Sequence, residues 1–177
     1  MNGLGLSKGQ VEDVFRPALQ EALSQEIFKR YFIGLDEYDY VLKLFIQSVL
    51  DSGGTWHAKC LEETTHFYLS HFLKPLETEA AKIRGDQALI VSGVIYGARK
   101  LEFSGCYLTR RPNLRGLAEC GRMFYEVAGT GTINREIART FRRLAVNFGL
   151  WVTALGKVQE NEHIKRMLLP LQESDDN

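Results

Sequence analysis

The stretch INREIARTFRRLAVNFGLWVTALGKV, residues 133–158, decides how the rest of the chain is interpreted. Large apolar side chains recur in it at steps of three, four and seven residues, at Ile137, Phe141, Leu144, Phe148 and Leu155. This spacing places them on one face of an α-helix. The pattern predicts one long helix from about residue 133 past residue 158, whose apolar face is buried in the core of a mainly α-helical domain.

Helical patterns also cover most of the remaining chain. Ser7 and Gln10 have the spacing of a capping box that begins a helix, and Pro17 is expected to stop or kink that helix and start a second one. We expect the helices before the last one near residues 8–16, 17–33, 36–50, 55–73, 75–83 and 114–128, with a turn at 129–132. The sequence therefore predicts a single domain over residues 1–177, a bundle of six or seven helices with a disordered acidic tail at 173–177.

Residues 88–108 fit two structures. Alternation of apolar and polar side chains over 100–107 favours a strand, and Gly97-Ala98 suits the turn of a β-hairpin whose first strand is 88–96. A helix is favoured by Asp86 as a cap and by Ile90 and Val94 on one helical face. We expect a helix here, and a hairpin at 88–108 within an α+β fold is the alternative.

The composition is that of an ordinary globular protein. The chain has 177 residues, 45% of them hydrophobic, and a formal net charge of zero. It holds no run of about eighteen apolar residues that could span a membrane, and no pattern typical of a secretion signal. Its three cysteines form no CxxC pair, which indicates free thiols rather than disulfides or a zinc site. We expect a cytoplasmic protein that does not enter a membrane.

Arginines gather on the face of residues 133–158 opposite the apolar one. Guanidinium groups make bidentate contacts with carboxylates and phosphates, so an acidic protein surface is a suitable partner. A solvated face without a partner is the alternative. A nucleic acid fits less well, because no aromatic residues interleave with the arginines. The candidate partner-binding residues are Arg135, Arg139, Arg142 and Arg143, with Arg110 and Arg111 in the preceding segment.

A polar seam is expected along the apolar face of residues 55–73. Buried imidazoles need hydrogen-bond partners, so the seam either bonds to neighbouring helices or lines a pocket for a metal, a haem or a small ligand. It consists of His57, Cys60, Thr64 and His71. A structural role is the simpler interpretation, and no cofactor is predicted.

Small residues form a strip beside the apolar face of 133–158. Glycine within a helix costs up to about 1 kcal/mol relative to alanine, so its presence calls for a reason. Close approach of another helix is one, either from the same chain or from a second copy in a homodimer. The strip consists of Ala138, Ala145, Gly149 and Gly156.

Motifs typical of catalysis or of a metal centre are not indicated. Two Glu-x-x-His pairs, Glu63 with His66 and Glu160 with His163, have the spacing of di-iron ligands, but the helical phase turns Glu63, His66 and Glu160 away from the core, whereas such ligands project inward. The sequence thus predicts a non-catalytic regulatory or adaptor domain that binds an acidic partner and self-associates. A sensor or carrier domain that holds a ligand at the His57 seam is the alternative.

Overall fold

The computed structural model describes residues 7–50, 77–95 and 114–164 and confirms a mainly α-helical fold. These residues contain no strand. Their helices, in chain order, are α1 (Lys8–Ser24), α2 (Leu35–Leu50), α4 (Thr78–Ile90), the π-helix η1 (Val91–Ile95), α5 (Leu114–Gly131), α6 (Arg135–Val146) and α7 (Phe148–Val158). None of the described helices is long and apolar enough to cross a lipid bilayer.

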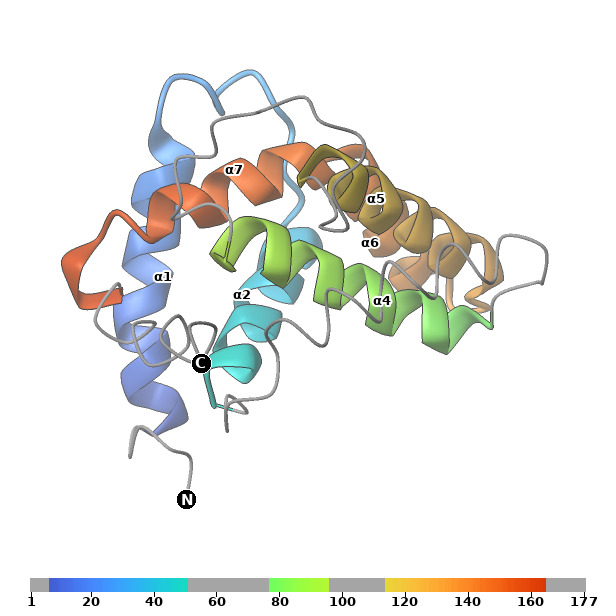
Figure 1. The fold of residues 1–177 in the computed structure, drawn as a ribbon, viewed down its shortest axis with the longest axis horizontal. Helices are drawn as coiled ribbons and strands as arrows, with labels where there is room; N and C mark the ends of the chain where they lie inside the picture. The colour runs from blue at the N-terminus through green and yellow to red at the C-terminus, as the bar shows by residue number, and fades with distance from the viewer. Residues whose placement is uncertain (1–6, 51–76, 96–113, 165–177) are drawn as a thin grey trace, which may run out of the picture.

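The described helices pack around one hydrophobic core (Figure 1). Helix α5 lies between α4 and α6 and packs closely against both, while α7 contacts α1 and η1. The largest fully buried side chains come from different helices and include Phe15 of α1, Phe45 of α2, Tyr125 of α5 and Trp151 of α7. The rings of Phe15 and Phe45 stack on each other, which joins α1 to α2.

The long helix expected over residues 133–158 is two helices, so this prediction is wrong. The helical path ends at Asn147, whose backbone angles of φ −95° and ψ 14° lie outside the helical region. The Asn147 side-chain amide donates to the Glu37 carboxylate, with the nitrogen 3.0 Å from Oε1. Glu37 is fully buried and also accepts hydrogen bonds from the Trp151 indole and the Gly34 amide. The break therefore provides donors for a buried carboxylate that comes from a distant part of the sequence.

The predicted apolar face of residues 133–158 is confirmed in its centre but not at its start. Phe141, Leu144, Phe148 and Leu155 are buried. Ile133, by contrast, lies before α6 and is 97% exposed, and Ile137 is half exposed. The first turn of α6 thus projects beyond the core.

Helix α1 continues through Pro17, which contradicts the predicted separation of two helices at this residue. Pro17 lies on the exposed face in the middle of α1, and the helix runs on to Ser24. Residues 25–34 then form a connecting segment instead of the end of a second helix. The predicted capping box at Ser7 and Gln10 is confirmed by both of its hydrogen bonds.

The helix preferred for residues 88–108 is confirmed for residues 88–95, and residues 96–108 lie outside the described residues. Two other local predictions are wrong. Asp86 does not cap a helix but lies inside α4, where it is buried. Residues 129–131 belong to α5 and not to a turn, which begins only at Thr132.

Candidate functional site

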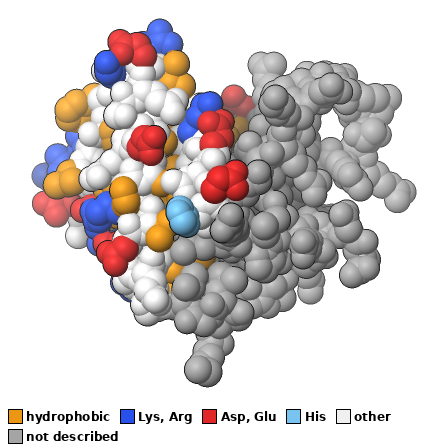
Figure 2. Space-filling view, turned by 90° about the vertical axis from the view of Figure 1, so that its left-hand side faces the viewer, with side chains coloured by type: hydrophobic (Ala, Val, Ile, Leu, Met, Phe, Trp, Pro, Cys, Tyr) orange, Lys and Arg blue, Asp and Glu red, His pale blue; other side chains and the backbone are white. Residues whose placement is uncertain are grey.

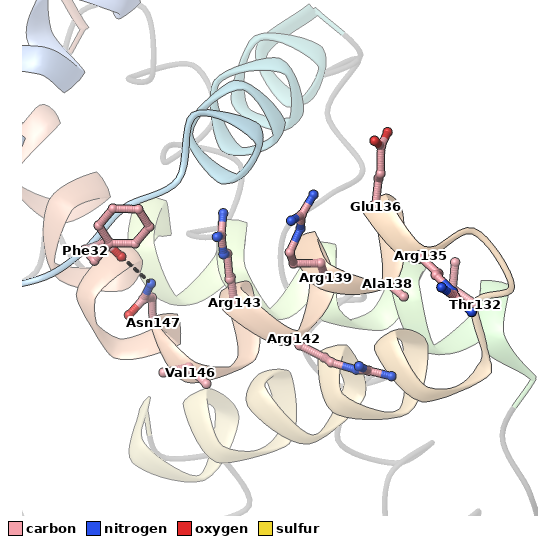
Figure 3. A pocket seen from close by; sticks show the side chains of 10 residues that line it. All are labelled: Phe32, Thr132, Arg135, Glu136, Ala138, Arg139, Arg142, Arg143, Val146 and Asn147. Atoms are coloured by element: carbon pink, nitrogen blue, oxygen red, sulfur yellow. Dashed lines mark hydrogen bonds between the residues drawn. The ribbon is translucent and has the colours of Figure 1, made fainter.

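An open groove of about 880 Å³ runs along the outward face of α6 (Figure 3). We call it the arginine groove, because it contains all four arginines of α6. The predicted orientation of these side chains, away from the core, is confirmed for the three that are exposed, Arg135, Arg139 and Arg142. The groove is lined by Phe32, Thr132, Arg135, Glu136, Ala138, Arg139, Arg142, Arg143, Val146 and Asn147.

Three of the four arginines form no ion pair within the described part of the chain. They are Arg135, Arg139 and Arg142, and Glu136 is the single acidic side chain among the lining residues that the structure describes. On the face of the molecule that carries α1, by contrast, basic and acidic side chains lie next to one another (Figure 2). The groove is therefore a local concentration of positive charge in a chain whose net charge is zero.

Arg143 differs from the other three because its charge is neutralised within the fold. Its guanidinium lies 2.8 Å from Oδ1 of Asp36 at the start of α2, and 5.5 Å from the centre of the Phe32 ring. The Thr140 hydroxyl donates to the other carboxylate oxygen of Asp36 at 2.9 Å. Partial burial alone would raise the pKa of Asp36, but the Thr140 hydroxyl and Arg143 together hold it below its usual value.

The backbone of α5 fixes the position of Arg142. A Cβ atom placed on Gly129 would lie 2.8 Å from Cγ of Arg142 and only 3.1 Å from the carbonyl oxygen of Ala138. Helices α5 and α6 can approach this closely only because residue 129 is a glycine. The stem of Arg142 thus rests on α5, and Figure 3 shows it on the α5 side of α6, with Arg139 and Arg143 on the α2 side.

The small-residue strip is divided by the helix break at Asn147. Ala138 and Ala145 are buried within the chain, whereas Gly149 of α7 is exposed and Gly156 is half-buried. The close helix approach near Ala138 is made by α5 of the same chain, one of the two explanations left open by the sequence. The homodimer contact remains a prediction, and Gly149 is the most accessible of the four residues.

A buried polar cluster that the sequence did not reveal joins α2, α4 and α5. The hydroxyls of Tyr40 and Tyr125 both donate to Oδ1 of Asp86 at 2.7 Å, and the Lys82 ammonium lies 3.4 Å from Oδ2. Burial raises the pKa of Asp86, although the two hydroxyls and Lys82 oppose this. The cluster thereby links α2, α4 and α5 through hydrogen bonds to one buried carboxylate.

Several predicted site residues cannot be placed. The seam residues His57, Cys60, Thr64 and His71, and also Arg110 and Arg111, lie outside the described residues. Within residues 7–50, 77–95 and 114–164, no group of three or more potential metal ligands occurs. Glu160 and His163 are both exposed, and Glu160 pairs with Lys157. The thiol of Cys120 is half-buried, and this burial raises its pKa.

Comparison with known proteins found no matching family model, no similar curated protein and no similar solved structure. The geometry and charge of the arginine groove are therefore the features that bear on function.

Proposed function

We propose that the chain is a non-catalytic regulatory or adaptor protein that binds an acidic segment of a protein partner in the arginine groove. One observation carries this proposal. Three exposed arginines of one helix lie together in a concave surface, and none of them has an acidic partner within the described residues. Unpaired charges in a cleft attract a ligand of opposite charge and orient it as it approaches.

The spacing of the arginines favours an elongated acidic ligand. Arg135, Arg139 and Arg142 are separated by four and three residues, so they share the outward face of α6, with Arg139 on its α2 side and Arg142 on its α5 side. From Arg135 to Arg142 this face extends about 10 Å along the helix axis, at 1.5 Å per helical residue. A protein segment with carboxylates about one helical turn apart can contact all three guanidinium groups at once.

The test compares two variants of the full chain. Reversal of the groove charges in R135E/R139E/R142E is matched by reversal of three exposed lysines outside the groove in K8E/K29E/K43E. The probe is a fluorescein-labelled peptide of glutamate and alanine, and binding is measured by fluorescence anisotropy at low salt. An exposed charge pair contributes roughly 0.5 kcal/mol, so the loss of three pairs should weaken binding by the groove variant about tenfold. The lysine variant should bind nearly as well as the native chain.

Two results would overturn the proposal. In one, both variants lose the same affinity, which would assign binding to the net charge of the chain. In the other, an oligonucleotide of equal charge binds in the groove and displaces the peptide completely, which would point to a nucleic acid instead. Circular dichroism of all proteins establishes that the helices are intact.

A further inference from the structure

The two ends of the arginine groove differ in chemistry. The end nearest the start of α6 holds the charges that lack an acidic partner, on Arg135, Arg139 and Arg142. The other end, at the close of α6, is lined by Phe32 and Val146, whose side chains are 78% and 83% exposed. Single exposed apolar residues are common on protein surfaces, but here two of them line the same end of one groove.

The second end is less cationic than the presence of Arg143 in the sequence suggests. Its guanidinium is bonded to Asp36 and lies against the Phe32 ring. Gly34 lies directly beneath this pair, and a Cβ atom there would collide with the guanidinium and with Asp36. The fold therefore holds Arg143 in a neutralised pair at the end of the groove that Phe32 and Val146 line together with Asn147 (Figure 3).

The carboxylates around the groove favour a protein segment over an anionic membrane. Glu136 lines the groove beside the arginines (Figure 3), and Asp36 of α2 lies against Arg143 at its other end. A flat layer of lipid phosphates would meet these two carboxylates together with the arginines. A concave surface with both signs of charge fits a segment whose acidic side chains are placed one by one.

One end of the groove is cationic and the other is apolar. Building on the proposed function, we infer from this difference that the groove binds an amphipathic acidic segment in one orientation. Carboxylates of the segment lie over Arg135, Arg139 and Arg142, and a large apolar side chain packs on Phe32 and Val146. From Arg135 to Val146 the groove follows α6 for about 16 Å, at 1.5 Å per residue. This length corresponds to about three turns of a helical ligand or about five residues of an extended one.

The test uses two labelled peptides that differ only at their apolar end. One has a run of glutamates followed by leucine and phenylalanine, and in the other these two residues are serines. The native chain should bind the first peptide roughly fivefold more tightly, because partial burial of an apolar side chain is favourable. Val146→Ser should remove this preference and leave the affinity for the serine peptide unchanged. Ile133→Ser makes the same chemical change at an exposed residue outside the groove and should keep the preference.

The possible results distinguish a failure of this inference from a failure of the proposed function. If R135E/R139E/R142E loses both peptides but the native chain shows no preference between them, the inference is overturned and the proposed function stands. If neither peptide binds the native chain, both fail. If the chain binds vesicles of phosphatidylcholine and phosphatidylserine through the same arginines and binds neither peptide, the groove is a membrane contact and both are again overturned.

Discussion

The outward faces of α5 and α6 both display arginine, but they differ in how its charge is balanced. On α5, Arg122 lies between Glu119 and Glu126, one turn away on either side, and bonds to both. Such pairs at three- and four-residue spacing neutralise a helix surface locally. On α6 the three exposed arginines have no such partners among the described residues, and the fourth pairs with Asp36 of another helix. Among the described residues, the charge of Arg122 on α5 is therefore balanced within its own helix, whereas the three exposed charges of α6 are not.

The side chains of the two faces are also positioned by different kinds of contact. The ion pairs of α5 involve residues of one helix, whereas the end of the arginine groove depends on contacts between distant segments. Asn147, which lines the groove, is held by the buried Glu37 carboxylate and by the carbonyl of Phe32. Substitutions of buried residues should therefore alter the geometry of the groove. They should not alter the ion pairs on the α5 face.

Removal of the Glu37 carboxylate should have the largest effect. Glu37→Ala leaves the buried Trp151 indole without its acceptor and the half-buried Asn147 amide with only the Phe32 carbonyl. A buried donor without an acceptor costs about 1–3 kcal/mol, so the free energy of unfolding should fall by about 2 kcal/mol or more in urea denaturation. Glu37→Gln keeps one acceptor oxygen and should lose less. Equal losses for the two variants, or a loss below about 1 kcal/mol for Glu37→Ala, would show that this carboxylate does not hold the α6–α7 junction.

This junction also shows where prediction from the sequence reaches its limit. The apolar and cationic faces of α6 were predictable because helical periodicity is a local property of the chain. The break at Asn147 was not, because its cause is Glu37, which is 110 residues away in the sequence. Asp86 was mistaken for a cap for the same reason, since its partners Tyr40 and Tyr125 come from other helices.

The arginine groove was likewise predictable in part. The lack of acidic residues three or four positions from most of its arginines can be read from the sequence, and α5 shows what the balanced pattern looks like. The neutralisation of Arg143 by Asp36 could not be read, because the two residues are 107 positions apart. The sequence therefore indicated a charged face, but not the difference between its two ends.

Asp36→Asn should have an intermediate effect, this time on ligand affinity. It increases the number of arginines on α6 that lack an acidic partner, which is the property that separates α6 from α5. The variant releases Arg143 from its ion pair and so gives the groove a fourth available charge. The peptide of glutamate and alanine should then bind about two- to threefold more tightly, as expected for one additional exposed charge pair. Asp13→Asn removes an exposed acidic charge from α1 and is the matched control, which should leave the affinity unchanged. Weaker binding by Asp36→Asn would mean that Asp36 positions Arg143 for the ligand.

The same variant should alter the stability of the protein in acid. Because the pKa of Asp36 is lowered in the folded state, its ionised form stabilises the native chain above the ordinary aspartate pKa of 3.8. This contribution is lost as the pH falls from that value through the lowered pKa. Asp36→Asn lacks the contribution at every pH, so the stabilities of the two chains should converge as the pH falls below the lowered pKa of Asp36. Denaturation curves at a series of pH values provide the measurement.

The smallest effect is expected when the α5 face is made to resemble α6. The variant E119A/E126A removes both partners of Arg122 and should cost at most about 1 kcal/mol of stability, since each pair contributes about 0.2–0.5 kcal/mol. It leaves a lone arginine outside the groove, without a second unpaired arginine one turn away on the same helix. The acidic peptide should therefore bind no more tightly than it binds the native chain. A gain in affinity as large as the loss caused by R135E/R139E/R142E would mean that one unpaired arginine anywhere on the surface is sufficient, and that the concave arrangement along α6 contributes nothing.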